Sequence, residues 1–345
     1  MSERTIAIDR PMTLGRFFLQ WEWLLVLIFL LVNVINSGLS RYYLNFRALI
    51  GSTNSFLDMA FLVMPMTFVI ILGNIDISVA STVALSAVTM AVGFNAGLPM
   101  PLAMLLCLVV ATACGLFNGL ILVRFKELSA VIVTLATMII YRGIAYVILQ
   151  DQASGHFPQW YNYLAWGNFH HVPFILIVFA VCALAFGLLL HRTSFGRKVF
   201  AMGNNLTAAR YSGIRTDSVI VWVSALTGLM AGFTALFLTS RMGSTRPNVA
   251  QGYELSVIAM VVLGGVSTSG GSGRIGGPIL AVFIIGYLNY GLGLVNTTAN
   301  VLLIIIGSLL ILSVLVLNVR LGGRIPRPSS PRAIKPDRGR TPDEK

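Results

Sequence analysis

One segment of the sequence fits a nucleotide-binding motif: Gly271–Gly276, which reads G-S-G-R-I-G. The G-x-G-x-x-G fingerprint binds a dinucleotide where a β-strand precedes it and an acidic residue follows about 20 positions later. Apolar runs flank these glycines on both sides, and the next acidic residue is Asp337. We therefore interpret the segment and its neighbouring glycines as a break at which the chain passes close to packed helices.

The other residue patterns that indicate catalysis are missing. The sequence contains no G-x-x-x-x-G-K-[S/T], so the chain has no P-loop and cannot bind ATP in that way. It contains no G-x-S-x-G motif, and its histidines show no metal-ligand spacing with cysteines or glutamates. Cys107, Cys114 and Cys182 lie inside apolar runs and are interpreted as buried structural thiols. We therefore predict no catalytic residue, no metal site and no cofactor on this chain.

Charged residues within or beside apolar runs are stronger candidates for function. An ionised group at mid-membrane costs about 2.5–3.5 kcal/mol on insertion scales. Asp58 and Asp76 flank one apolar run, Arg142 lies within another, and Glu254 opens a third. Arg142 is predicted to have a partner or to face a wet cavity. Asp76, which follows Asn74 and precedes a helical run, either caps that helix or has a direct role in transport. For Glu254 we expect a structural role at the membrane interface.

Uncharged polar residues and small residues also interrupt the apolar runs. Asn118, Thr134 and Thr137 either line a path or donate hydrogen bonds to a neighbouring helix, and both interpretations stay open. Close helix packing in lipid is favoured by G-x-x-x-G spacings. These spacings occur at Gly115/Gly119 and Gly228/Gly232.

The composition shows what kind of fold must position these residues. Of the 345 residues, 56% are hydrophobic and only 10% are charged, with a mean hydropathy of +0.83. Soluble domains carry about 25% charged residues. The composition therefore excludes a soluble enzyme, a disordered chain and a disulfide scaffold. It predicts an all-α, polytopic helical membrane protein.

Ten apolar runs predict about ten transmembrane helices, which would place both termini on the same side. The runs lie at 21–36, 56–72, 79–93, 102–123, 130–149, 172–190, 218–238, 254–264, 278–292 and 300–317. Most lysines and arginines then fall on the side of the termini, and only Arg41, Arg47, Arg241 and Arg246 fall on the other side. By the positive-inside rule, the N- and C-termini are cytoplasmic. The net charge of +12 forms no single basic face, so we predict a bilayer and not a nucleic acid as partner.

This topology divides the chain into three parts. We expect residues 1–20 to form a cytoplasmic N-terminal segment, 21–317 the transmembrane domain, and 318–345 a basic, disordered cytoplasmic tail. The loop at 150–171 is predicted outside and the loop at 191–217 inside. Within the inner loop, Thr207–Tyr211 is predicted to form a short helix that Asn204 or Asn205 caps and Gly213 ends. Such a helix suggests a docking element, while a plain basic loop that fixes topology is the alternative.

Several segments, in the same order along the chain, resemble those of sugar-type ABC importer permeases. They are Gly73–Val79, Gly115–Gly119, Ile132–Met138, Tyr141–Gly143, Phe195–Arg197, Ala201–Asn205, Ala208–Arg210, Ser212–Ile214, Tyr253–Leu255, Gly264–Gly265 and Gly270–Gly273. The sequence departs from the family pattern at Asn74 and Ala80, where glycine is usual. A substrate preference is therefore not transferred through this segment.

The resemblance implies the membrane subunit of a binding-protein-dependent importer of the ribose, rhamnose and autoinducer-2 group in the cell inner membrane. It implies three partners: cytoplasmic ATP-binding subunits that hold ATP and Mg, a periplasmic solute-binding protein, and a second copy or a related permease. The inner loop is then the ATPase-docking loop. Its implied docking residues are Gly196, Arg197, Gly203, Asn204, Ala208, Arg210 and Gly213.

Two other functions remain to be compared with the importer. An ion-coupled secondary carrier for a small polar solute would hold ionisable groups near mid-membrane and often shows inverted repeats. The sequence has few such acids and no convincing repeat. A passive channel would leave the polar, basic loop at 191–217 without a role.

Overall fold

Helices make up most of the chain in the computed structural model, which describes residues 21–297, 301, 304–305, 307–308 and 311. The helices of the first half are α2 (Trp21–Leu39), α3 (Phe46–Ser52), η1 (Thr53–Ser55), α4 (Leu57–Ala60), α5 (Val63–Ile71), α6 (Val79–Asn95), α7 (Met100–Arg124) and α8 (Ala130–Leu149). Those of the second half are η2 (Gln159–Asn162), α9 (Tyr163–Trp166), α10 (Phe174–Arg192), α11 (Ser194–Asn204), α12 (Leu206–Tyr211), α13 (Thr216–Met242), α14 (Tyr253–Leu263) and α15 (Gly276–Leu294). The predicted helical membrane class is confirmed.

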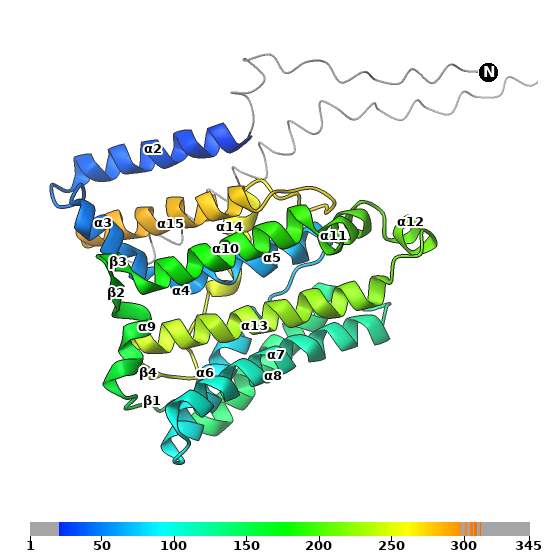
Figure 1. Cartoon of the computed structure of the whole chain (residues 1–345), viewed down its shortest axis with the longest axis horizontal. Coiled ribbons are helices and arrows are strands. Elements are labelled where there is room, and N and C mark those ends of the chain that lie inside the picture. Colours follow the sequence, from blue (N-terminus) through cyan, green and yellow to red (C-terminus); the bar gives the residue numbers. More distant parts are fainter. Residues whose placement is uncertain (1–20, 298–300, 302–303, 306, 309–310, 312–345) are drawn as a thin grey trace, which may run out of the picture.

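Within the described residues, β structure is limited to two short antiparallel pairs. β1 (Ser154–Gly155) pairs with β4 (Ser244–Thr245), and β2 (Asn168–Phe169) pairs with β3 (Val172–Pro173). Both pairs lie at the end of the bundle opposite α11 and α12 (Figure 1). The two long loops of the sequence therefore lie at opposite ends of the molecule.

Five helices are long and apolar enough to cross a membrane: α7, α8, α10, α13 and α15. A sixth span is added if the segments Phe46–Ser55 and Leu57–Ile71, which meet at a bend of 59°, are counted as one. Three further apolar runs form the shorter helices α2, α6 and α14. Most of the tenth run, at 300–317, lies outside the described residues. The number ten and the side of the termini therefore stay predictions.

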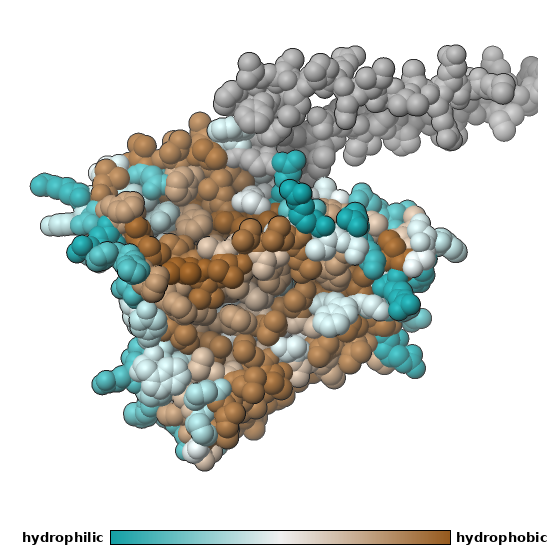
Figure 2. Space-filling view, viewed as in Figure 1, coloured by the Kyte–Doolittle hydropathy of each residue, from teal (hydrophilic) through white to brown (hydrophobic). Residues whose placement is uncertain are grey.

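The surface of the bundle carries an apolar band between two polar ends. On the face that Figure 2 shows, hydrophobic residues cover the middle, and hydrophilic residues gather at the α11–α12 end and at the opposite end near the β-strands. Leu105 and Val109 on α7 and Ile139 and Val147 on α8 are more than half exposed. A bilayer satisfies such a surface because its hydrocarbon core contacts the band and its headgroups contact the ends.

α7 packs tightly against α13, and glycines make this close approach possible. A Cβ added to Gly115 would lie 2.9 Å from the Cα of Gly228 and would overlap the carbonyl oxygen of Ser224. A Cβ added to Gly119 would lie 3.0 Å from the Cβ of Ser224. The predicted role of the two G-x-x-x-G spacings in helix packing is confirmed, because the two motifs pack on each other.

Gly228→Ala is expected to separate α7 from α13. The added Cβ would overlap the carbonyl oxygen of Ala111, and neither backbone can move aside without parting the helices. Overpacking of this kind destabilises by about 1–3 kcal/mol. Gly143→Ala is the control, because nothing lies within 4 Å of a Cβ added there. The thermal unfolding midpoints of the detergent-purified variants test this, and equal midpoints for both variants would contradict the packing argument.

Candidate functional site

Asp76 lies in the non-helical link between α5 and α6 and organises the start of α6. Its Oδ1 accepts hydrogen bonds from the Ser78 N–H at 2.8 Å and from the Ser78 Oγ at 2.6 Å. Ser78 is the N-cap residue of α6 and makes no capping bond with its own side chain. Asp76 therefore fixes the turn that leads into α6, and it does so from two residues before the N-cap position at Ser78.

A chain of hydrogen bonds from two other helices ends at Asp76. The Tyr141 hydroxyl on α8 donates to Asn118 Oδ1 at 3.0 Å, and Asn118 Nδ2 on α7 donates to Ser78 Oγ at 2.8 Å. Ser78 Oγ donates in turn to Asp76. Every donor points toward the carboxylate, an arrangement that stabilises its charged form. No described cation lies within ion-pair distance of Asp76, and no described residue hydrogen-bonds to its Oδ2.

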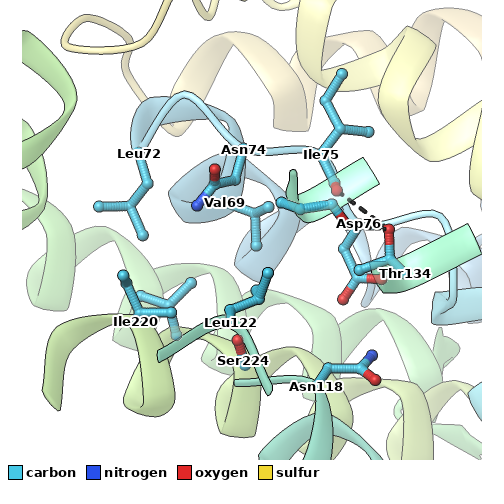
Figure 3. Close-up of a pocket in the computed structure, with 12 residues that line it drawn as sticks. Val69, Leu72, Asn74, Ile75, Asp76, Asn118, Leu122, Thr134, Ile220 and Ser224 are labelled. Carbon is cyan, nitrogen blue, oxygen red and sulfur yellow. Dashed lines mark hydrogen bonds between the residues drawn. The ribbon is translucent and has the colours of Figure 1, made fainter. Parts of the chain in front are cut away.

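A narrow pocket opens beside this chain, lined by polar and apolar side chains (Figure 3). Its polar lining residues are Asn74, Asp76, Asn118, Thr134 and Ser224. The Thr134 hydroxyl accepts from the Ile77 N–H of the link at 3.2 Å, and it donates to the Ala130 carbonyl of its own helix at 2.9 Å. Carboxylate, amide and hydroxyl groups of this kind can bind the hydroxyls of a small polar solute.

Thr137 does not belong to this pocket. Its hydroxyl donates to the carbonyls of Val133 and Thr134 in its own helix, at 3.1 and 3.2 Å. The structure therefore brings together Asp76, Asn118 and Thr134 of the predicted polar residues, and it places Thr137 in a helix-internal bond.

Arg142 and Glu254 are not part of the pocket and lie near a second break in the helices. Arg142 Nη1 donates to the backbone carbonyls of Pro247 and Val249 at 2.6 and 2.8 Å, and so has the partner that its place in a span requires. These carbonyls belong to the non-helical segment that precedes α14. Glu254 lies in the first turn of α14, and its buried Oε2 has no hydrogen-bond partner among the described residues. Its interfacial structural role stays a prediction.

A buried ion pair joins α4 to α13, and the sequence did not reveal it. Asp58 Oδ2 lies 2.8 Å from Arg241 Nη2, with 1% and 23% of the respective side chains exposed. Arg241 Nη1 also donates to the Ser55 carbonyl at 2.8 Å. The Tyr253 hydroxyl, at the start of α14, lies 3.5 Å from the same carboxylate oxygen. Arg241, in the last turn of α13, is therefore a structural partner of Asp58.

The predicted inner loop at 191–217 is almost entirely helical. The helix expected at Thr207–Tyr211 exists as α12, and Asn205 caps it by accepting from the Ala208 N–H at 2.9 Å. Gly213, with φ +81°, ends it through hydrogen bonds that close a Schellman motif. α11 was not predicted. The signal that could have revealed it is its amphipathic pattern. Gly196, Val199 and Met202 are buried, whereas Arg197 and Lys198 are exposed.

The implied docking residues divide into two groups. Arg197, Ala208 and Arg210 are exposed at the end of the bundle and can meet a partner. Gly196, Gly203 and Asn204 contact other parts of the chain, and Gly213 provides the turn after α12. Ala208 and Arg210 share α12 with Tyr211, which is 90% exposed, and Leu206, which is 45% exposed.

The glycine-rich segment at 264–277 forms the tight turn between α14 and α15. Gly265, Gly270, Gly271 and Gly273 all adopt positive φ. The segment contacts α5 and α11 through backbone atoms, so its interpretation as a close-packed break is confirmed.

Residues 48–314 match the family described as branched-chain amino acid transport system / permease component. Three relatives cover 86% of this chain and 91% of their own length, and each is named autoinducer 2 import system permease protein LsrD. The protein from Yersinia enterocolitica is 38% identical over 304 residues, that from Yersinia pestis (strain Pestoides F) is 36% identical, and that from Salmonella paratyphi B is 35% identical. No solved structure matches the chain.

Removing one partner of the buried ion pair is expected to lower the free energy of unfolding far more than replacing both partners with apolar residues. Arg241→Met leaves the Asp58 carboxylate buried without its cation, a loss of about 3–5 kcal/mol. The double variant Asp58→Leu/Arg241→Met removes both charges and should recover much of that loss. The exposed pair Lys126–Asp217, at 2.9 Å with 52% and 44% of the side chains exposed, is the control.

Removing the exposed pair should change stability by less than about 1 kcal/mol. Thermal unfolding of the purified variants measures all of these differences. A double variant as unstable as the sum of its single variants would show that Asp58 and Arg241 do not act as a pair.

Proposed function

The chain belongs to the family of branched-chain amino acid transport system permease components, and we propose that it imports a small sugar or sugar-like solute as the membrane subunit of an ABC importer. It is a multi-pass permease of the cell inner membrane. The observation that carries the proposal is its identity of 38% with an autoinducer 2 import permease along 91% of that relative.

A solute of the autoinducer-2 class is the substrate that we propose. The relatives named in this way match the chain over nearly their whole length. The polar groups around Asp76 fit a neutral, hydroxyl-bearing solute by their chemistry, because the Asp76 carboxylate accepts hydrogen bonds and the amide of Asn74 offers both donors and an acceptor. The cavity has a volume of about 20 Å³, the space of about one water, so a sugar would enter it only after the surrounding helices move apart. Ribose and rhamnose present the same chemistry.

The proposed topology has ten spans, with both termini in the cytoplasm. The α11–α12 end of the bundle then faces the cytoplasm, and the strands β1–β4 face the periplasm, where a solute-binding protein would dock. This orientation places Arg192, Arg197, Arg210 and Arg215 on the cytoplasmic side, as the positive-inside rule requires. A second copy or a related permease would complete the membrane unit.

The ATP-binding subunits are proposed to dock on α12. The helix is short and capped at both ends, and its exposed surface combines apolar Leu206 and Tyr211 with the cation Arg210. ATP and Mg would be bound by the partner subunits, because this chain has no phosphate-binding loop. An arginine suits such a surface because its guanidinium makes bidentate contacts with acidic residues.

The energy source separates the importer from an ion-coupled carrier. One observation favours a carrier: the buried carboxylate of Asp76 has no described cation beside it. We expect uptake into vesicles to stop when the partner ATPase is inactivated and the ion gradient is left intact. We expect uptake to continue when a protonophore collapses the gradient and ATP is supplied. Uptake that persists without ATP and stops with the protonophore would identify a carrier.

Arg210→Glu is expected to reduce the amount of ATPase that co-purifies with the chain, because it sets like charges against the acidic groups of the partner. The position is exposed, so the amount of permease in the membrane should stay unchanged. Arg215→Glu is the matched control, because it makes the same change of charge at an exposed position outside α12. Equal recovery of the ATPase with both variants would leave the loop at 191–217 as a topology signal only.

A further inference from the structure

Three segments that are far apart in the sequence meet backbone to backbone beside α11. They are the end of α5 at Ile71–Gly73, the end of α11 at Gly203–Asn204, and the turn at Gly270–Gly271. The Gly271 N–H donates to the Ile71 carbonyl at 2.8 Å. A Cβ added to Gly203 would overlap that same carbonyl and would lie 2.6 Å from the Gly271 nitrogen. We call this contact the glycine junction.

Asn204 ties α11 to the glycine junction through its side-chain nitrogen. Nδ2 donates to the Gly271 carbonyl at 3.1 Å and to the Phe200 carbonyl at 2.8 Å. Both partners are acceptors, so the side chain can bridge them only with its NH₂ group. The amide therefore fixes the last turn of α11 to the turn between α14 and α15.

The next residue ties α11 to α12. Asn205 is the single residue between the two helices, and its Oδ1 accepts from the Ala208 N–H. α12 is thus attached to the glycine junction by one capped residue. Because no flexible linker separates the two helices, a displacement of α12 must also move the end of α11.

The other side of the glycine junction leads to the polar pocket. Gly73, with φ +78°, closes a Schellman motif at the end of α5 by donating to the Ile70 carbonyl, while Asn74 donates to the Val69 carbonyl. The chain then continues directly to Asp76 and its bonds with Ser78. Because no side chain separates the backbones at the junction, a shift of α11 must move Ile71 and the link behind it.

We propose that Asn204 is a positioning residue that transmits the movement of α12 through the glycine junction to the Asp76 link. The inference rests on the proposed docking of an ATPase on α12, and it adds the route from that helix to the pocket. In this role Asn204 acts on the solute site through Gly271 and Ile71 and does not contact the ATPase itself.

The same substitution at two adjacent asparagines tests this role. Asn204→Asp is isosteric but replaces the donor group with an acceptor, so the bridge to the Gly271 carbonyl is lost. Asn205→Asp keeps the oxygen that caps α12, because only Oδ1 is used there. Each variant is reconstituted in lipid vesicles with the partner ATPase and the solute-binding protein. ATPase recovery, solute-stimulated ATP hydrolysis and uptake are measured on each.

For Asn204→Asp we expect normal ATPase recovery and loss of the stimulation of hydrolysis by solute. Uptake should fall by roughly 5- to 150-fold, the fold-change that typical coupling free energies produce. Asn205→Asp should retain all three properties. A merely structural role of Asn204 would lower the amount of assembled complex and leave the stimulation per complex unchanged. That result would overturn the proposal, and so would stimulated hydrolysis and uptake equal to those of Asn205→Asp.

A second variant reaches the same contact without a change of charge. Gly203→Ala places a Cβ against the Ile71 carbonyl, whereas nothing lies within 4 Å of a Cβ added to Gly276. Gly203→Ala should lose the stimulation of hydrolysis while Gly276→Ala keeps it, and equal stimulation in both would overturn the proposal. Failure of the unsubstituted chain to recover any ATPase would instead refute the proposed function, so the two failures are distinguishable.

Discussion

An apolar bundle requires every backbone N–H and C=O group to find a partner within the protein, because lipid hydrocarbon offers none. A helix meets this requirement within itself, so the demand concentrates where a helix stops inside the bundle. In the described chain such stops occur at the link 72–78 before α6, at the segment 246–252 before α14, and at the turn 264–275 before α15. Several glycines with positive φ lie in these three stretches of backbone, among them Gly73, Gly252, Gly265 and Gly270.

Polar side chains from other helices supply the missing partners. Arg142 bonds carbonyls of the segment before α14, Thr134 bonds the link before α6, and Asn204 bonds the turn before α15. These three side chains therefore serve non-helical backbone, whereas Thr137 bonds carbonyls of its own helix. Asp76 differs, because its Oδ1 serves the backbone while its Oδ2 has no described partner. This difference is the reason why we propose the pocket beside Asp76 as the place for a solute.

The sequence predicted the features that depend on local pattern. Nine of the apolar runs became helices, the two G-x-x-x-G motifs pack on each other, and α12 is capped by Asn205 and ended by Gly213. It did not predict the partners of Arg142 or the ion pair of Asp58. A backbone carbonyl has no residue type that marks it as an acceptor, and the partners lie more than 100 residues away. Long-range contacts of this kind are decided by helix packing, which one sequence does not display.

The ion pair between Asp58 and Arg241 also constrains the order in which the helices are synthesised and buried. A ribosome adds about 5–20 residues per second, and 186 residues separate Ser55 from Arg241, which binds its carbonyl. The carboxylate of α4 is therefore made roughly 10–40 s before its guanidinium partner. During that interval the Asp58 carboxylate has no guanidinium beside it, so burying α4 would cost the free energy of an unpaired buried charge. Burial of α4 against α13 must then be a late step of biogenesis, and a nascent chain halted before α13 would hold its first helices in the membrane without this contact.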